Sequence, residues 1–426
     1  DIFSTSPLLA NSEISNKGVT VLGEGFFLSD EELHEIISID SQAQRVIRLI
    51  YKGKDITDSP RGLKVIDLYG LTEQQVQQQY PNIYQRIKDR VFPVRSVQKR
   101  KAYRDNWWVF AEPRSYLRKA LEGLERYIAT VETAKHRVFS FLNLNILPDV
   151  KLAIVASDDA YHLGILSSKI HIVWSLIVGS TLEDRPVYSK STCFDPFPFP
   201  NPTPEQKQKI RELGERLDSH RKRVQTQHPE ITITGMYNLL EKLRKGETFT
   251  DADKTYNNKA LVSTLKQIHD ELDNAVLDAY EWQDLKDNQK TKAEIEEIIL
   301  ERLVTLNAER AEEERNGIVR WLRPEYQAPN EVTQKVLTEV METEATVIIP
   351  SEQKTFPKQP KEQLAAIRDL LRTNTSEWTV DQIAAQFKNG RWNKNAIAEN
   401  VERLEWFGIL ICRETGATKR WQYVEI

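Results

Sequence analysis

The densest group of side chains that could do chemistry is a basic run in the N-terminal quarter of the chain. Between Arg86 and Arg104 lie eight Lys or Arg residues and a single acid, Asp89, with aromatic residues on both sides. Cations beside aromatic rings suit a phosphate backbone and its bases. A solvated basic helix and loop is the alternative. We predict DNA contacts for the basic residues of this run: Arg86, Lys88, Arg90, Arg95, Lys99, Arg100, Lys101 and Arg104.

A second candidate surface lies near the C-terminus. Residues 361–426 predict three helices followed by a hairpin, which is the order of a winged helix, a fold that often binds DNA. Arg391 and Lys394 lie at the start of the predicted third helix, residues 393–407, and are further DNA-contact candidates. The same helix carries acids that would repel phosphates, so its pattern favours protein contact over DNA contact. These acids are Glu399, Glu402 and Glu405.

Residues for catalysis or metal binding are not grouped in any familiar way. The run Cys193–Phe197 faintly resembles the Asn/Asp-Pro-Pro-aromatic motif of amino-methyltransferases, but its second proline is missing. No glycine-rich loop follows a strand, so we interpret the run as a structural brace. His162 and His171 are nine residues apart on one predicted helix and face opposite sides, which argues against a shared metal. Asp158 and Asp159 precede that helix and predict a cap.

Composition limits the protein's class and its partners. The 426 residues are 40% apolar and 29% charged, as expected for a soluble chain of two or three domains. The net charge is −4, so nucleic-acid binding requires local basic patches. No apolar run reaches the length of a membrane span, and no membrane partner is expected. Two distant cysteines favour a reducing cytoplasm.

Local patterns predict an α+β protein. Strands are expected at residues 46–51, 63–69, 107–111 and 152–156, and helices at 72–88, 113–133 and 158–179. Long polar helices follow a proline-rich stretch, at residues 204–227, 259–280 and 291–315. We predict a mixed domain (1–200), a helical bundle or arm (201–322), a linker (323–360) and a winged helix (361–426).

Several runs, in this order and spacing, resemble the C-terminal half of large bacterial adenine-specific DNA methyltransferases. These are the type IIG-like restriction–modification enzymes and the DISARM-type phage-defence enzymes. The resemblance covers about residues 10 to 200. In that family this half follows the catalytic domain and contains the target recognition domain. The runs are Tyr51–Ile56, Ile66–Gly70, Tyr103–Trp108 with Pro113–Arg114, Tyr161–Ser168 and Phe194–Pro200.

The resemblance implies a function and partners. It implies DNA sequence recognition for an adenine-N6 methyltransferase, with double-stranded DNA and an upstream methyltransferase domain as partners. S-adenosylmethionine would serve the parent enzyme, and no cofactor is expected in this chain. The chain begins at Asp1 instead of Met, which we interpret as a fragment lacking the catalytic motifs. The alternative is a protein-interaction module that docks a partner protein of a defence complex. An independent hydrolase has no supporting constellation.

Overall fold

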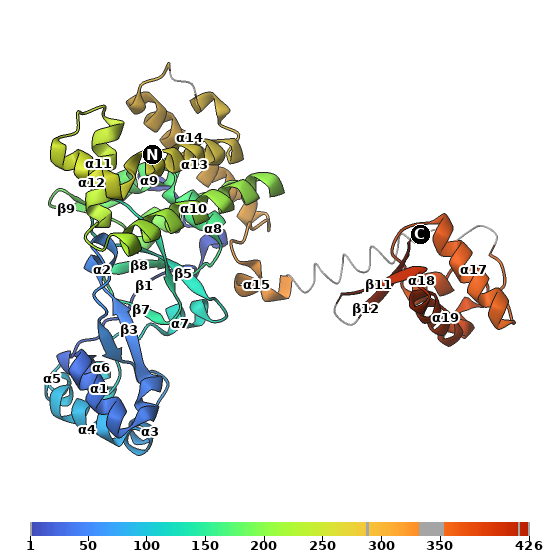
Figure 1. The fold of residues 1–426 in the computed structure, drawn as a ribbon, viewed down its shortest axis with the longest axis horizontal. Helices are drawn as coiled ribbons and strands as arrows, with labels where there is room; N and C mark the ends of the chain where they lie inside the picture. The colour runs from blue at the N-terminus through green and yellow to red at the C-terminus, as the bar shows by residue number, and fades with distance from the viewer. Residues whose placement is uncertain (1, 287–288, 332–352, 416–417, 425–426) are drawn as a thin grey trace. The chain divides into compact units, whose positions relative to one another are not determined.

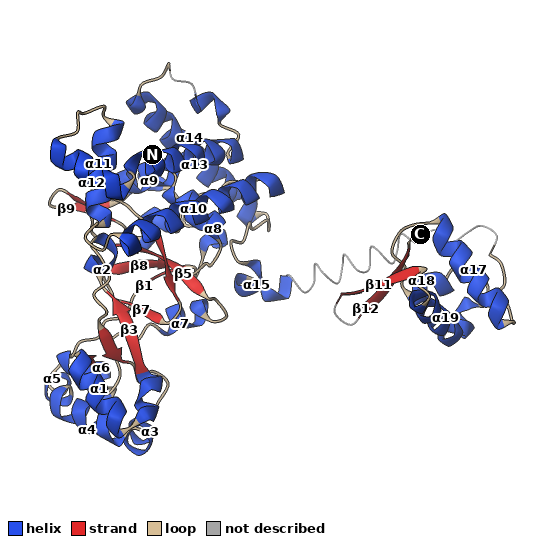
Figure 2. Ribbon diagram, in the orientation of Figure 1, coloured by secondary structure: helices blue, strands red, loops and turns tan. Residues whose placement is uncertain are grey.

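The structure is a computed structural model that describes residues 2–286, 289–331, 353–415 and 418–424. The chain divides into two compact units, Asp1–Gln327 (unit 1) and Ala328–Ile426 (unit 2) (Figure 1). Unit 1 combines two four-stranded sheets with many helices, which confirms the predicted α+β class (Figure 2). Each unit has its own hydrophobic core and is described separately.

The first sheet of unit 1 lies in a small lobe, which residues 19–112 form together with the later strand β7. Its order is β2-β4-β3-β7, with β4 antiparallel to β2 and β3, and β7 parallel to β3. The strands are β2 (Phe27–Leu28), β3 (Ile47–Tyr51), β4 (Lys64–Ile66) and β7 (Ile146–Pro148). The helices that pack beside them are α1 (Asp30–Ile39), α3 (Glu73–Gln79), α4 (Pro81–Arg90), α5 (Phe92–Arg95) and α6 (Lys101–Asp105).

The second sheet is antiparallel and joins the small lobe to the rest of unit 1. Its order is β1-β8-β5-β6. The strands are β1 (Ser15–Lys17), β5 (Arg126–Val131), β6 (Ser140–Asn143) and β8 (Leu152–Val155), and a separate hairpin pairs β9 (Ser180–Leu182) with β10 (Arg185–Val187). The helices near this sheet are α2 (Gly53–Thr57), α7 (Ser115–Leu121), α8 (Ala160–Ser167) and α9 (Lys169–Val178).

Helices from the second half of unit 1 cover the antiparallel sheet. They are α10 (Pro204–Gln227), α11 (Ile233–Arg244), α12 (Asp251–Ala260), α13 (Val262–Ala279), α14 (Lys292–Arg315) and α15 (Pro324–Gln327). One hydrophobic core contains Ile14 and Ile128 as well as Leu213 and Leu303. The predicted domains 1–200 and 201–322 therefore form one unit, because residues of both contribute to this core.

Helices α8 and α10 approach each other closely at two glycines. An added Cβ on Gly214 would lie 2.3 Å from the carbonyl oxygen of Ala160, and one on Gly164 would lie 2.7 Å from Ile210. Real side chains do not approach that closely, so only glycine fits at this crossing. The crossing ties residue 164 of the predicted domain 1–200 to residue 214 of the predicted helical region 201–322.

The N-terminal segment, residues 6–12, is held by residues some 300 positions later in the chain. The Asn307 side chain accepts from the amide of Ser6 (3.0 Å) and donates to its carbonyl (2.8 Å). Glu314 accepts from the amides of Leu9 (2.8 Å) and Ala10 (3.0 Å). Gln327 donates to the carbonyls of Ala10 and Ser12, both at 2.9 Å. The start and end of unit 1 therefore form one structure.

Several predicted elements are wrong, each for a local reason. The expected helix at residues 113–133 ends at Leu121, because Gly123 takes a φ of +80° and the strand-forming residues of β5 follow. The expected helix at 72–88 breaks at Pro81, which cannot continue a helix but starts α4 well. Residues 107–111 form turns instead of a strand. Residues 158–179 form two helices bent by 60°.

Unit 2 has the predicted order of elements. Helices α17 (Pro360–Thr373), α18 (Val380–Ala384) and α19 (Lys394–Trp406) precede an antiparallel hairpin of β11 (Leu410–Thr415) and β12 (Thr418–Tyr423). Trp378 bridges to Trp421 on β12. Of the predicted linker, residues 323–327 belong to unit 1, because the buried Arg323 donates to the carbonyls of Ala120 and Ala156. Residues 332–352 of that prediction lie outside the described residues.

No single described helix is long and apolar enough to cross a membrane. The bent pair of α8 and α9 meets the same criteria of length and composition when the two are taken together. Both of these helices are mostly buried in the core of unit 1.

Candidate nucleic-acid interface

Arg95 lies at the centre of the predicted basic run and is fully buried. Its guanidinium donates to the carbonyls of Tyr103 (3.1 Å), Asn106 (3.2 Å) and Val109 (2.6 Å). Burial lowers the pKa of Arg95 below its ordinary value. The predicted direct contact of Arg95 with DNA is wrong. Its guanidinium is buried, and its N–H groups donate to backbone carbonyls of the same lobe.

Two further arginines of the run also serve the fold. Arg104 donates to the carbonyls of Gln98 (2.6 Å) and Lys99 (2.8 Å). Arg86 donates to the carbonyls of Gly25 and Phe27 and forms an ion pair with Glu32 at 3.1 Å. The amide of Ser29 and then Arg86 lower the pKa of Glu32 to about 2. Both guanidinium groups are therefore occupied by internal partners.

The bonds of Arg95 and Arg104 hold the chain around an exposed stretch, residues 96–101, which we call the basic loop. The loop carries Lys99, Arg100 and Lys101 on its solvent side. Its Val97 side chain is 77% exposed. Arg95 and Arg104 thus stabilise the basic loop through hydrogen bonds to backbone carbonyls, while the side chains of Lys99, Arg100 and Lys101 are exposed to solvent.

The exposed cations of this region have weak partners. Arg100 pairs with Glu112 at 3.1 Å, Lys101 with Asp105 at 2.6 Å, and Arg90 with Glu32 at 2.9 Å. Among the residues that the structure describes, no partner of the Lys99 amine is found. Exposed ion pairs contribute between 0 and about 1 kcal/mol, so phosphates can replace these carboxylates at little cost.

Lys88 takes a different position from the loop residues. Its amine lies over the ring of Phe92 (3.8 Å to the centroid) and near that of Trp107 (4.8 Å). Trp107 is buried in the small-lobe core. The structure therefore brings Arg90, Lys99, Arg100 and Lys101 to the surface, and keeps Lys88 against aromatic rings.

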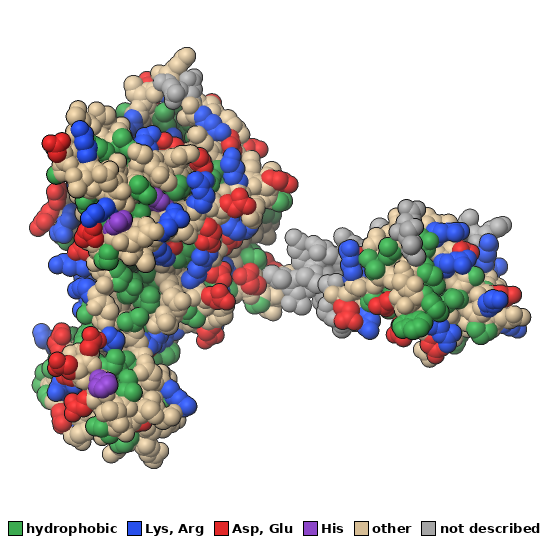
Figure 3. Space-filling model, viewed as in Figure 1, with side chains coloured by type: hydrophobic (Ala, Val, Ile, Leu, Met, Phe, Trp, Pro, Cys, Tyr) green, Lys and Arg blue, Asp and Glu red, His purple; other side chains and the backbone are tan. Residues whose placement is uncertain are grey.

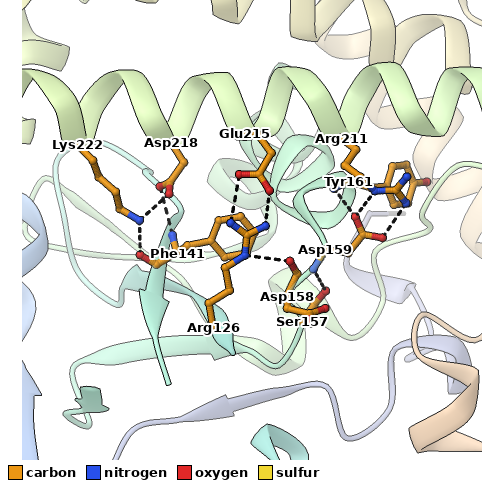
Figure 4. Close-up of polar contacts among 10 residues, drawn as sticks. All are labelled: Arg126, Phe141, Ser157, Asp158, Asp159, Tyr161, Arg211, Glu215, Asp218 and Lys222. Atoms are coloured by element: carbon orange, nitrogen blue, oxygen red, sulfur yellow. Dashed lines mark hydrogen bonds and ion pairs between the residues drawn. The ribbon is translucent and has the colours of Figure 1, made fainter. Parts of the chain in front are cut away.

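A polar ladder fixes α10 along the free edge of the second sheet (Figure 4). Strand β6 is the edge strand, and Asp218 accepts from the amide of Phe141 (3.3 Å) while Lys222 donates to its carbonyl (2.6 Å). Arg126 forms a two-pronged ion pair with Glu215 and lies over the Phe141 ring, 3.7 Å from its centroid. These contacts satisfy an otherwise open strand edge, which would invite pairing with other chains.

Asp159 caps α8, as predicted, and it has no free capacity for a metal. It accepts from the amide of Tyr161 (2.9 Å) and from two nitrogens of Arg211 (2.8 and 3.0 Å). Burial raises the pKa of Asp159, but Arg211 and the Tyr161 amide outweigh burial and bring it to about 2. The described residues contain no group of three His, Cys, Asp or Glu side chains suited to a metal ion.

The two histidines of this region are separate and neutral. The Nδ1 of His162 lies 2.6 Å from the Ser157 hydroxyl, and the Nε2 of His171 lies 2.8 Å from the Tyr188 hydroxyl. Burial lowers the pKa of His162 to about 4 and that of His171 to about 3. Each histidine therefore belongs to the core.

Because His162 and His171 are buried with lowered pKa values, we expect the protein to lose stability in mild acid. The unfolded chain binds protons at both sites below pH 6.5, whereas the folded chain does not, so the free energy of unfolding falls as pH decreases. From pH 7 to pH 5 each histidine should cost about 2 kcal/mol. Asp273 opposes this in part, because burial raises its pKa to about 6. Urea unfolding at the two pH values measures the loss.

A His162→Gln variant should lose less stability on acidification than the parent chain. Equal acid losses in the parent and the His162→Gln variant would contradict the neutral, buried state.

The Phe194–Pro200 run is held by asparagine and arginine side chains from elsewhere in unit 1. Asn11 donates to three of its carbonyls, those of Phe194, Asp195 and Phe197, at 2.8 to 3.1 Å. Asn307 donates to the Pro196 carbonyl (2.7 Å) and Arg310 to that of Phe199 (2.8 Å). These contacts are those of a structural brace, and they leave these carbonyls no role in holding a base.

In unit 2 the two predicted DNA-contact residues lie at the start of α19. Lys394 forms an ion pair with Asp381 of α18, and Arg391 is exposed in a short 3-10 turn, Gly390–Asn393. The solvent side of α19 also carries Glu399 and Glu402. The charges around these two cations are therefore mixed.

Comparison with known proteins finds a similar domain for the N-terminal part of unit 1. Residues 4–201 match the family model described as the target recognition domain of MmeI. This match confirms the resemblance to target-recognition halves, and it covers a little under half of the chain. No curated protein matches the sequence.

Among the solved structures that match, one example is similar over a longer stretch. It is described as the type IIL restriction–modification enzyme MmeI in complex with DNA. The TM-score is 0.52 and the sequence identity 19%, over 73% of this chain and 36% of that one. At this identity the similarity shows a shared fold. The chain spans about a third of the length of that enzyme.

Sequence reasoning did not separate the structural arginines from the exposed cations. A usable signal exists, because Ile83, Ile87, Val91 and Arg95 follow one another at intervals of four residues. That spacing places Arg95 on the buried face of the helical segment. The same spacing does not apply to residues 99–101, which lie on the solvent side.

Proposed function

We propose that unit 1 recognises the DNA target of a restriction–modification enzyme that methylates adenine at N6. The match of residues 4–201 to the MmeI target recognition domain is the observation that supports this most. The similar MmeI structure holds DNA, and its fold covers most of unit 1. The catalytic domain would lie upstream of this chain, in a cytoplasmic restriction or phage-defence system.

The basic loop would contact the DNA backbone. Lys99 has no internal partner among the described residues, and Arg100 and Lys101 can exchange exposed carboxylates for phosphates. Phosphate contacts fix register, while polar side chains on nearby loops would read base edges. The loop would hold the duplex while the upstream domain takes an adenine out of the stack.

S-adenosylmethionine would be the methyl donor of the parent enzyme and would bind in its upstream domain. This chain would supply DNA binding and orientation without methyl transfer. Methyl transfer from S-adenosylmethionine to DNA by the purified 426-residue chain would overturn this assignment.

A salt series of duplex DNA binding, followed by fluorescence anisotropy, tests the proposal. Lys99→Ala and Arg100→Ala should each weaken binding to all sequences and reduce the log–log salt slope by about one unit. Each substitution removes one phosphate contact and the counterion that this contact releases.

Lys254→Ala on α12 is the matched control, because Lys254 is an exposed lysine in the helical part of unit 1. Its slope should equal that of the parent chain. An unchanged slope in the Lys99 and Arg100 variants would remove the basic loop from the DNA interface. Absence of DNA binding at low salt would count against recognition by this chain alone.

The alternative function, a module that docks a partner protein, applies to unit 2. The glutamates on the solvent side of α19 favour it. A winged-helix classification of unit 2 would leave this choice open, since such folds bind both proteins and DNA.

A further inference from the structure

Unit 2 exposes large aromatic side chains at both ends of α19. Trp392 is 88% exposed, Trp406 83% and Phe407 58%, and Ile411 of β11 is also exposed. The rings of Trp406 and Phe407 meet edge to face, with centroids 5.2 Å apart. Figure 3 shows apolar side chains on the visible face of unit 2. Tryptophan is largely buried in most folded proteins, and grouped exposed aromatics mark interaction sites.

The solvent face of α19 forms one stripe. Asn395, Glu399, Glu402 and Trp406 are all exposed and follow one another at intervals of four, three and four residues, which places them along one side of the helix. The opposite side is buried in the core of unit 2 through Ile397, Val401 and Leu404. We call Trp392 and the exposed stripe together the α19 face.

The charge of the α19 face is negative at its centre. Arg403 approaches Glu399 only at 4.0 Å, and no ion pair of Glu402 is found among the described residues. The nearby Lys394 is already paired with Asp381. Glu399 is weakly paired and Glu402 has no ion pair among the described residues, and such carboxylates repel phosphates, so this face suits a cationic protein partner better than DNA.

The distance between the two exposed tryptophans of the α19 face suits a short partner helix. Trp392 lies in the 3-10 turn before α19 and Trp406 is the last residue of α19, so a helix of 13 residues, about 20 Å long, separates them. A partner helix lying along α19 would meet an aromatic ring at each end and carboxylates between them. Such a partner needs apolar residues near its ends and Lys or Arg in its middle.

We propose that the α19 face docks a basic amphipathic helix of a partner protein. Trp392 and Trp406 would bind its apolar ends, and Glu399 and Glu402 would pair with its central cations. This is the helix-on-surface mode of peptide recognition, with tryptophans as the anchors. The proposal concerns unit 2 and holds independently of DNA recognition by unit 1.

A labelled helical peptide of about 18 residues tests the proposal with the full 426-residue chain. The peptide carries leucines fourteen positions apart and lysines between them, and a matched peptide carries glutamates in place of the lysines. Anisotropy should show binding of the basic peptide only. Trp406→Ala should raise its Kd about 30-fold, because one of the two tryptophan anchors is lost. Glu402→Lys should raise it about tenfold at low salt.

Glu362→Lys on α17 is the control for charge, because Glu362 is an exposed glutamate of the same unit. It should leave peptide binding unchanged, and circular dichroism should show intact helices in all variants. No binding of the basic peptide, or equal binding of both peptides, would overturn the proposal. Loss of duplex DNA affinity in Trp406→Ala without loss of peptide affinity would assign the α19 face to DNA instead.

Discussion

Replacing Gly214 with alanine is expected to destabilise unit 1 by about 3 kcal/mol. The new Cβ would lie 2.3 Å from the carbonyl oxygen of Ala160, a backbone atom that cannot move aside alone. Helices α8 and α10 would have to separate, and the core that they share would lose its packing. This cost exceeds the gain of about 1 kcal/mol that alanine brings inside a helix. Urea unfolding followed by circular dichroism measures the difference.

Ser219→Ala on the exposed side of the same helix is the matched control. It should be neutral or slightly stabilising, since it improves helix propensity without a clash. A Gly214→Ala variant as stable as the parent chain would show that α8 and α10 can shift apart without loss. In that case the two halves of unit 1 would be less tightly coupled than their shared core indicates.

Arg95→Ala is expected to lower both stability and DNA affinity. The substitution leaves the carbonyls of Tyr103, Asn106 and Val109 without their donor and opens a cavity in the small lobe. Unpaired buried polar groups cost about 1 to 3 kcal/mol each, so a loss of about 3 kcal/mol or more is expected. Because the basic loop would lose its support, binding should weaken for all DNA sequences.

Hydrogen exchange distinguishes this effect from loss of a direct contact. Arg95→Ala should accelerate amide exchange in α4, α5 and α6, whereas the exposed Arg100→Ala should leave exchange unchanged and reduce only the salt slope. Arg95→Lys should fall between the two, because an ammonium group cannot reproduce the fork of a guanidinium. Unchanged exchange in Arg95→Ala would contradict the supporting role.

The sequence predicted the long helices well, because their ends carry strong local signals. The bounds of α10 agree with the prediction, and α14 starts at Lys292, one residue after the predicted start at Thr291, which is its N-cap. Both helices have capping boxes, which are readable from four residues. The prediction of one helix over residues 113–133 was wrong, because the apolar residues there fit both the helical and the strand periodicity. Gly123 and pairing of β5 within the sheet make the second part a strand.

The candidate site was only partly predictable. Residue type alone identifies a basic run, but it does not show which guanidinium groups face carbonyls. Arg95, Arg86 and Arg104 differ from Arg100 in burial and partners, which depend on chain turns at residues 96–101. The cores and charges of unit 2, by contrast, followed from helix periodicity, so the exposed glutamates of α19 were visible in the sequence.

The N-terminal segment has a consequence for synthesis and for module exchange. Ser6 pairs with Asn307, 301 residues away, so its amide lacks a native partner for roughly 15 to 60 seconds of translation. Recognition modules are attractive cassettes for transplantation between enzymes. A cassette cut at residue 201 would leave behind Asn307, Glu314 and Gln327, and the backbone of residues 6–12 would lose its hydrogen-bond partners. A working transplant therefore has to extend through residue 327.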